Sequence, residues 1–395
     1  MKYAIVLPDG AADEPVEKLG GRTPLEAAAT PNMDWIALHG RQGRVRTVPA
    51  GMPPGSDIAT LSLLGYDPRR FHAGRAPLEA AARGILVGEN DLIFRCNLVT
   101  IVDGMLADFS AGHIGQTEAD QLIVFLNERI GDATVRFHTS VSYRNLLTLS
   151  GAAGIDCHCT PPNDIPDQPV AQHLPRGAGA ERLIAIQERA AALLTAHEIN
   201  QVRRDLGENP ANAIWLWGQG RPSSLETFQH RFGVVGAAIA AVDLIRGLAI
   251  KLGFDLIDVP GATGYLDTNY RGKGAQAIVA LENHDLALIH IEAPDEAGHN
   301  GDIAGKVRAL EQIDECIVGP LLEYFRRQEA WKILVAPDHP TPVGKRVHTD
   351  VPPPFCLAGS GVAGVYQEPF SETNAAAADL QIEHGHELME YFLKA

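Results

Sequence analysis

Three apolar runs, far apart in the sequence, each end in side chains that bind metal ions in proteins. Residues 3–8 lead into Asp9, residues 286–291 lead into Asp295 and His299, and residues 333–337 lead into Asp338 and His339. Short apolar runs bounded by Gly, Pro or Asp are typical of buried β-strands. Since the carboxyl ends of parallel strands meet at one edge of an open α/β sheet, we expect these side chains to converge. The sequence therefore predicts an α/β fold with a mainly parallel sheet flanked by helices.

The pair Asp295 and His299 has the spacing of neighbours on one helical face. A helix beginning after Pro294 would place the two side chains about one turn apart, close enough to share a cation. Taken alone, the pair has a second interpretation as a solvated helix face. The two other apolar runs that end in candidate ligands favour the metal interpretation.

Length and composition indicate a globular protein of two domains. The 395 residues exceed the roughly 250 to 300 at which one hydrophobic core usually stops growing. With 45% hydrophobic and 21% charged residues, the composition is that of an ordinary globular protein. The formal net charge of −16 disfavours nucleic acid and anionic membranes as partners. A small anionic substrate remains compatible, because its site needs only local arginines and metal ions.

The sequence predicts neither a disulfide framework nor a membrane segment. Five cysteines are too few for such a framework in a chain of this length, and the group Cys157-His158-Cys159 lacks the second Cys pair of a zinc site. The first apolar run is too short for a signal peptide, and charged residues interrupt the longest apolar tract, 234–254. We therefore expect a reduced, cytoplasmic protein. The sequence carries no signal of the oligomeric state.

Ser56 follows a Pro/Gly-rich turn at the start of a predicted helix. One interpretation is that Ser56 is an N-cap, although position 59 has no Glu or Gln to complete a capping box. The other interpretation is functional, because free backbone N–H groups at a helix N-terminus hold phosphate groups. The sequence leaves both open.

A change in the character of the chain predicts an inserted domain. Residues 80–222 contain short strand-like runs, a Gly/Pro/Asn-rich loop and one amphipathic helix, which indicate a smaller α+β substrate domain. Residues 1–79 and 223–395 would form the discontinuous main domain. Beyond residue 222, apolar runs alternate with helical stretches, as in a largely parallel sheet.

Basic residues of both domains are candidates to bind an anionic substrate. For each one alone, a solvated surface position is the competing interpretation. The candidates are His113, Arg144, Arg203 and Arg221 in the inserted domain, and Arg246 and Lys273 in the main domain.

The candidate ligands are numerous enough for two divalent metal ions. They are Asp9, Ser56, Asp295, His299, Asp338, His339 and His348. Two cations a few ångströms apart can stabilise both the attacking and the leaving oxygen of an in-line phosphoryl displacement, and a metal-bound Ser oxygen is an activated nucleophile. Carboxylate and imidazole ligands suit Mn²⁺ or Zn²⁺ better than Ca²⁺. Mn²⁺ is the first expectation, with Zn²⁺ and Mg²⁺ as alternatives.

Further motifs accompany these ligands along nearly the whole chain. They are Pro54-Gly55-Ser56-Asp57, Ala73-Gly74-Arg75, Pro210-Ala211-Asn212 and Gly261-Ala262-Thr263-Gly264. With them, the chain resembles the alkaline phosphatase superfamily, and most closely the archaeal-type branch of cofactor-independent (2,3-bisphosphoglycerate-independent) phosphoglycerate mutase.

The resemblance implies a fold, a set of site residues and an activity. It implies an alkaline-phosphatase-like α/β domain interrupted by a substrate domain, with Ser56 as the phosphoryl acceptor. Asp9, Ser56, Asp338 and His339 would bind one metal ion, and Asp295, His299 and His348 the other. It also implies interconversion of 3-phosphoglycerate and 2-phosphoglycerate through a phosphoserine, a step of glycolysis and gluconeogenesis. Water must be excluded, because a solvated phosphoserine would be hydrolysed.

Two positions depart from the family pattern. Trp217 and His113 stand where archaeal-type mutases tend to have arginine, so we expect fewer permanent positive charges in the substrate site. The alternative function is a related phosphotransferase or phosphatase on the same scaffold, such as the proposed homoserine kinase-like branch. A metal-stabilised binding protein without activity ranks last, because no ligand position is lost.

Overall fold

The chain divides into two compact units. The computed structural model describes residues 1–222 and 224–394. The first unit comprises Met1–His72 with Ser224–Ala395, and the second comprises Ala73–Ser223. The chain therefore passes from the first unit to the second after His72, a few residues before the predicted domain boundary at residue 79. The reason is helix α5 (Arg75–Ala82), whose Ala76 and Ala80 pack with Ile93 and Leu146 of the second unit.

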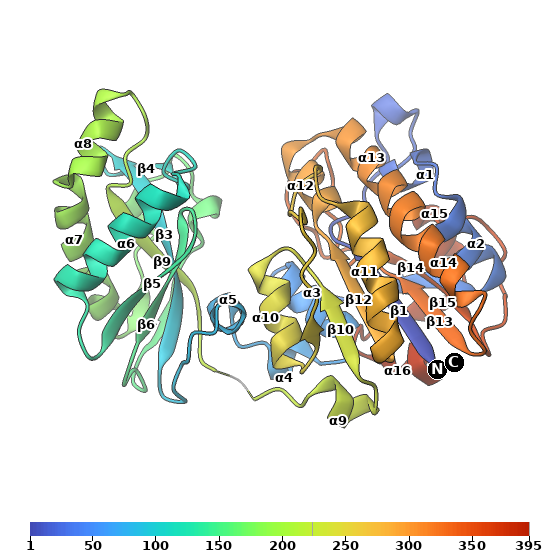
Figure 1. The fold of residues 1–395 in the computed structure, drawn as a ribbon. Coiled ribbons are helices and arrows are strands. Elements are labelled where there is room, and N and C mark those ends of the chain that lie inside the picture. The colour runs from blue at the N-terminus through green and yellow to red at the C-terminus, as the bar shows by residue number, and fades with distance from the viewer. Residues whose placement is uncertain (223, 395) are drawn as a thin grey trace. The chain divides into compact units, whose positions relative to one another are not determined.

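An eight-stranded sheet forms the centre of the first unit (Figure 1), in the order β11-β10-β12-β1-β13-β14-β2-β15. Strand β14 is antiparallel to both of its neighbours, whereas the other neighbouring pairs are parallel. The prediction of an α/β fold with a mainly parallel sheet is confirmed. The strands are β1 (Lys2–Pro8), β2 (Arg41–Val45), β10 (Gly236–Ile239), β11 (Asp255–Leu256), β12 (Leu286–Ile291), β13 (Trp331–Val335), β14 (Pro354–Gly359) and β15 (Leu380–Ile382).

Helices bury both faces of this sheet. Ala4 and Val6 of β1 join the core formed with α2, α11, α13 and α14, and the alternate residues Ile5 and Leu7 are buried on the opposite face. A strand buried on both faces reads as a continuous apolar run, which is why β1, β12 and β13 were visible in the sequence. The helices are α1 (Pro24–Ala27), α2 (Pro31–His39), α3 (Ser56–Leu63), α4 (Pro68–Phe71), α9 (Phe228–Phe232), α10 (Asp243–Lys251), α11 (Tyr270–Asn283), α12 (Ala293–Asn300), α13 (Ile303–Ile313), α14 (Gly319–Phe325), α15 (Glu372–Ala377) and α16 (Glu387–Lys394), with the short turns η1 (Glu17–Leu19) and η4 (Asp314–Val318).

The second unit is an antiparallel sheet with helices. Strand β3 pairs with β4, β6 and β9, and β6 pairs with β5. Helices α6 and α7 contribute to the main hydrophobic core of this unit, and a separate ribbon joins β7 to β8. The predicted α+β character is confirmed. The elements are β3 (Leu92–Val102), β4 (Met105–Asp108), α6 (Gln116–Ile130), β5 (Val135–Val141), β6 (Arg144–Leu149), β7 (Asp156–His158), η2 (Pro162–Asp164), η3 (Val170–Gln172), β8 (Arg176–Ala178), α7 (Ala180–Thr195), α8 (Glu198–Asp205) and β9 (Ala213–Gly220).

In the part of the chain that the structure describes, no helix is both long and apolar enough to cross a membrane.

Candidate metal centre

Three adjacent parallel strands, in the order β12-β1-β13, end at one edge of the first unit's sheet. Pro8 at the end of β1 pairs with Ile291 at the end of β12, and Val6 pairs with Val335 at the end of β13. The segments that follow these strands carry Asp9, then α12, and then Asp338 and His339. The structure thus has the convergence of strand ends that the apolar runs indicate.

A first group of possible ligands consists of Asp9, Asp338 and His339. One side-chain atom from each lies within 4.8 Å of the others. All three residues are almost completely buried. The Ser56 hydroxyl adjoins them, with its Oγ 3.1 Å from Asp9 Oδ2 and 3.2 Å from His339 Nε2.

The local backbone decides between the two interpretations of Ser56. Helix α3 begins at Ser56, and Gly55 occupies the N-cap position. The interpretation of Ser56 as the N-cap is therefore wrong. Its side chain points instead to Asp9 and His339, at a helix N-terminus that favours anions.

A second group consists of Asp295, His299 and His348. Helix α12 places Asp295 and His299 on one face, with His299 Nε2 3.3 Å from Asp295 Oδ2. His348 comes from a distant loop, and its Nε2 lies 2.8 Å from His299 Nε2 and 3.4 Å from Asp295 Oδ1. Two imidazole nitrogens and a carboxylate oxygen thus surround one point, as they would around a shared proton or a metal ion.

Thr341 and Gly10 hold the two groups together. The Thr341 hydroxyl donates to Asp295 and lies 3.4 Å from His339 Nδ1, so it contacts a member of each group. The Gly10 N–H donates to Asp338 Oδ1 at 3.1 Å. The imidazole rings of His339 and His348 have their centroids 4.1 Å apart. The seven predicted ligand residues therefore form one continuous cluster.

The carboxylates of this cluster have strongly perturbed acidities. Burial, together with the charges of Asp338, Asp295 and Glu292, raises the pKa of Asp9 well above its usual value. Burial would also raise the pKa of Asp295, but hydrogen bonds from His299 and His348 hold it well below the usual range. Burial alone would lower the pKa of His299, but its bond to Asp295 raises it to about 9. Buried carboxylates that repel one another in this way are typical of a site that a cation neutralises.

The residues present fit divalent metal ions. Asp338 Oδ2 is buried and accepts no hydrogen bond from the described chain, and a buried carboxylate oxygen without a partner is costly. The donors are carboxylate, imidazole and hydroxyl groups, which suit Mn²⁺, Zn²⁺ or Mg²⁺. The cluster could therefore hold divalent ions.

His290 and Glu292 form a further group with Asp9 that the sequence analysis did not single out as ligands. His290 Nε2 lies 3.1 Å from Asp9 Oδ2, and burial lowers the pKa of His290 to about 4. A neutral imidazole can thus orient the Asp9 carboxylate. The available signal was a histidine inside the otherwise apolar run of β12.

In the second unit, the structure brings two of the predicted substrate-binding residues to one aromatic side chain. The Arg144 guanidinium carbon lies 5.3 Å from the centre of the Tyr143 ring, and the His113 ring meets the same ring edge-on at 6.1 Å. His113 is exposed in a left-handed conformation with φ +50°.

Lys273 and Arg203, two of the predicted substrate-binding residues, are buried and have partners within their own units. Lys273 is completely buried, and its ammonium donates to the His290 carbonyl at 2.9 Å. Arg203 is 4% exposed and is paired with Glu118 and Glu208. In these positions both side chains support the packing of their own units.

Arg221 and Arg246 also have partners within their own units. Arg221 donates to three backbone carbonyls, those of Asn90, Ala152 and Ile155. Arg246 pairs with Asp258 at 2.8 Å and is partly exposed. None of these partners of Arg221 and Arg246 is itself a predicted substrate-binding residue.

Arg95 is a buried cation beside Trp217 that the sequence analysis missed. Its guanidinium carbon lies 4.3 Å from the centre of the Trp217 ring, and it forms a two-point ion pair with Glu79 at 3.0 and 3.1 Å. Burial, with the nearby cations Arg75 and Arg144, lowers the pKa of Arg95. The aromatic face at position 217 thus supports an arginine from the neighbouring strand β3.

Comparisons with known proteins agree on one family. A family model described as 2,3-bisphosphoglycerate-independent phosphoglycerate mutase matches residues 37–200. A protein of that name from Methanothrix thermoacetophila is 50% identical over 394 residues, which is 100% of both chains. A protein of Geobacter sulfurreducens named a probable mutase of the same kind is 45% identical over 404 residues, again 100% of both chains.

Two solved structures share the fold at the level of the whole chain. A Pyrococcus horikoshii protein matches with a TM-score of 0.84 and 30% identity, covering 99% of this chain and 96% of its own. The cofactor-independent phosphoglycerate mutase from Thermoplasma acidophilum matches with a TM-score of 0.66 and 28% identity, covering 100% and 99%.

Proposed function

Because the chain belongs to the 2,3-bisphosphoglycerate-independent phosphoglycerate mutase family, we propose that it interconverts 3-phosphoglycerate and 2-phosphoglycerate through a phosphoserine at Ser56. The observation that carries this proposal is the position of the Ser56 hydroxyl, 3.1 Å from Asp9 and 3.2 Å from His339 at the start of α3. Its substrate is a small phosphorylated acid.

The metal ions would occupy the two groups described above. We assign Asp9, Ser56, Asp338 and His339 to one ion, and Asp295, His299 and His348 to the other. When bound, divalent ions would lower the pKa of the serine hydroxyl and neutralise charge on the oxygens of the transferring phosphoryl group. Mn²⁺ is the expected ion, with Zn²⁺ and Mg²⁺ as alternatives.

The chain's own residues position the nucleophile and accept its proton. Both oxygens of Asp9 lie near Ser56 Oγ, at 3.1 and 3.4 Å, so the Asp9 oxygen that does not hold an ion can take the proton as the serine oxygen attacks phosphorus. The free backbone N–H groups at the start of α3 would donate to the phosphoryl oxygens of a substrate bound beside Ser56. The O–P bond of the substrate breaks, the protonated Asp9 returns its proton to the leaving oxygen, and glycerate stays in the site with both hydroxyls free. The second hydroxyl then attacks the phosphoserine and restores Ser56.

We propose Arg144, His113 and Arg246 as the remaining candidates to bind the carboxylate and phosphate of the substrate. Arg144 lies near Arg75 and Arg95, so this part of the second unit is strongly basic. An Arg fork binds either acidic group at two points. Arg95, which stacks on Trp217, is itself paired with Glu79.

The alternative of a phosphatase or a homoserine kinase-like enzyme is not favoured. Relatives at 45–50% identity over the full chain carry the mutase name, and all seven proposed ligands are present.

The proposal is tested by trapping the phosphoserine. The metal-loaded protein is mixed with 3-phosphoglycerate, quenched in acid and digested, and the peptide containing Ser56 is examined by mass spectrometry. We expect added phosphate on this peptide, and neither phosphate nor turnover in a folded Ser56→Ala variant. Turnover by the variant, or phosphate on another residue, would remove Ser56 from its role. Ser62, on the same helix and buried, provides the control variant Ser62→Ala, which should retain transfer.

A further inference from the structure

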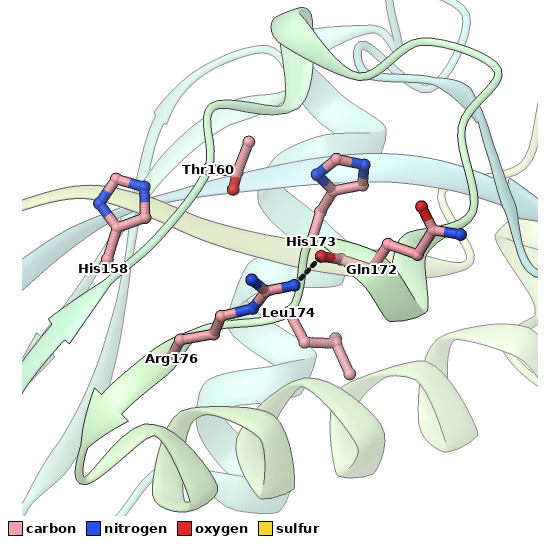
Figure 2. A pocket seen from close by; sticks show the side chains of 6 residues that line it. All are labelled: His158, Thr160, Gln172, His173, Leu174 and Arg176. Atoms are coloured by element: carbon pink, nitrogen blue, oxygen red, sulfur yellow. Dashed lines mark hydrogen bonds between the residues drawn. The ribbon is translucent and has the colours of Figure 1, made fainter.

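A pocket in the second unit takes no part in the proposed reaction. It lies beside the ribbon β7–β8 and the turn η3, and Figure 2 shows the side chains that line it. Its volume is about 470 Å³. The lining residues are His158, Thr160, Gln172, His173, Leu174 and Arg176.

The lining of this pocket is basic, although the whole chain is acidic. His158, His173 and Arg176 carry or can carry positive charge, and among the described residues that line the pocket none is acidic. The chain as a whole has a formal net charge of −16. A concave surface lined by one sign of charge concentrates ions of the opposite sign. The pocket therefore favours an anion.

The strand register places two of these groups face to face. His158 of β7 pairs directly with Arg176 of β8 in the antiparallel ribbon. Like charges at directly opposite positions destabilise a strand pair, so an anion bound between the His158 and Arg176 side chains would be stabilising. A two-stranded ribbon has little packing of its own with which to offset such repulsion.

His173 adds a buried donor or acceptor that lacks a partner. Its Nε2 atom is buried and makes no hydrogen bond within residues 1–222 and 224–394. Buried polar atoms of this kind are rare in folded proteins and need an explanation such as a bound ion or water. Figure 2 shows the His173 ring above the same hollow that Arg176 borders.

The walls of the pocket are fixed in place. Arg176 Nη2 donates to the Gln172 carbonyl at 2.5 Å, which orients the guanidinium. From β9, Trp215 Nε1 donates to the Thr160 carbonyl at 2.8 Å and Gln219 Nε2 donates to the Cys157 carbonyl at 2.6 Å. The segment 157–160 is thus attached to the five-stranded sheet, and a preorganised site loses less entropy when it binds a ligand.

We propose that this pocket binds the phosphate group of a small phosphate monoester. A phosphate dianion offers three acceptor oxygens, which match donors that come from β7, β8 and the loop after η3. The Arg176 fork can bind two of these oxygens, and the His158 and His173 rings can donate to the others. A volume of about 470 Å³ also leaves room for the carbon skeleton of the ester.

None of the residues that line this pocket has a role in the proposed mutase reaction. Its residues belong to the second unit, whereas the metal centre lies in the first. Binding at the pocket can therefore be measured at its own histidines, whether or not the protein has mutase activity.

The test follows the imidazole C–H signals of His158 and His173 by NMR in the full-length, Mg²⁺-loaded protein. The signals are assigned with the variants His158→Gln and His173→Gln. Inorganic phosphate and glycerol 2-phosphate are titrated in turn, with chloride at matched ionic strength as the reference. We expect both signals to shift and saturate together with either phosphate compound, with glycerol 2-phosphate binding at least as tightly as inorganic phosphate, and with no saturation in chloride.

Arg176→Gln should weaken this binding by about tenfold, the effect of losing one charge-assisted contact. Arg204→Gln is the matched control, because Arg204 is likewise exposed and donates to one backbone carbonyl, that of Thr195. The control should bind as the unaltered protein does. Signals that do not saturate, equal weakening in both variants, or saturation by inorganic phosphate alone would each overturn the proposal.

Discussion

Gly10 contacts ligands of both groups in the metal centre. It follows Asp9, its N–H donates to Asp338, and its α-carbon lies against Asp295. Its φ angle of +62° lies in the left-handed region that favours glycine. A single backbone position therefore sets the spacing of three candidate ligands.

Replacing Gly10 with alanine should disrupt the metal centre. The added Cβ would lie 2.5 Å from Asp295 Oδ1 and 2.6 Å from Asp295 Cα, so the α12 backbone itself would have to move. We expect loss of metal binding, together with a loss of about 1–3 kcal/mol of unfolding free energy from strain and overpacking. Equilibrium dialysis and urea denaturation measure the two effects.

Gly21→Ala is the control for backbone strain alone. Gly21 has φ +81°, and no atom lies within 4 Å of the position of its added Cβ. This variant should lose some stability but keep its metal ions. If Gly10→Ala binds metal as tightly as Gly21→Ala does, the proposed packing of Gly10 against Asp295 does not matter for the site.

At the scale of single residues, the sequence shows which residues are candidate metal ligands, but it does not show which residues hold those ligands in place. Asp9, Asp338 and His339 were visible because each follows a buried strand. Thr341 was not visible, because its bond to Asp295 joins residues 46 positions apart. The burial of Lys273 was not visible in the sequence, because a lysine usually lies at the surface, whereas α11 places this one under the His290 carbonyl.

At the element scale, α13 anchors both loops that carry the first ligand group. Its buried Lys306 donates to Asp13 Oδ2 at 2.7 Å, to the Thr341 carbonyl at 2.8 Å and to the Ala12 carbonyl at 3.3 Å. Ala12 and Asp13 follow Asp9, and Thr341 follows His339. One ammonium group thus connects the loop after β1 with the loop after β13.

Lys306→Met should destabilise the protein and loosen the metal centre. Removing one partner of a buried ion pair typically costs about 3–5 kcal/mol, because the other charge stays buried. We expect a lower urea midpoint and weaker metal binding in the folded variant. Lys345→Met, which breaks the exposed pair with Glu14, should change stability by only about 0–1 kcal/mol. Equal effects of the two substitutions would contradict the anchoring role.

Helix α15 carries a titrating group into the same network. Glu372 Oε1 accepts the Asp13 N–H at 3.1 Å, and Oε2 accepts the Thr23 hydroxyl at 2.7 Å. Burial of this carboxyl raises the pKa of Glu372 from 4.5 to about 7. Between these two values the folded state holds a proton that the unfolded state has released.

Glu372 should therefore make stability fall as the pH rises from 4.5 to 7. The folded state binds more protons than the unfolded state in this range, so the contribution of the raised pKa is complete below pH 4.5 and lost above pH 7. Its size is about 1–3 kcal/mol. In Glu372→Gln this part of the pH dependence should disappear, and urea unfolding at pH 5 and pH 8 measures the difference. A variant with the same pH dependence as the unaltered protein would show that Glu372 does not titrate in this way.

Strands could be predicted from the sequence where their apolar residues form a clear pattern. The strands β1, β12 and β13 were all expected from their short apolar runs. The antiparallel insertion of β14 between β13 and β2 was not, because strand direction depends on pairing and not on the strand's own residues. The boundary before α5 was missed because Ala76 and Ala80 pack on strands more than ten residues away.

At the scale of the whole molecule, the order β12-β1-β13 in the centre of the sheet creates the site. Each of these strands ends at the same edge, and each is followed by candidate ligands. The sequence revealed the three segments, and only the strand order makes them neighbours. The partners of the basic residues depend on tertiary packing, which the sequence does not show. The substrate-binding residues were therefore the least predictable part of the candidate site.

The proposed activity of the whole molecule is a metal-dependent transfer of a phosphoryl group within one substrate. The most direct measurement incubates the protein with 3-phosphoglycerate and quantifies all phosphorus-containing products by ³¹P NMR after quenching. It is made on the Mn²⁺-loaded protein and on the same protein after chelation, with metal content checked by elemental analysis. We predict formation of 2-phosphoglycerate without added 2,3-bisphosphoglycerate, the same final ratio when 2-phosphoglycerate is the starting compound, and no conversion after chelation. Release of inorganic phosphate as the main product, conversion by the metal-free protein, or no conversion by the folded metal-loaded protein would contradict this account.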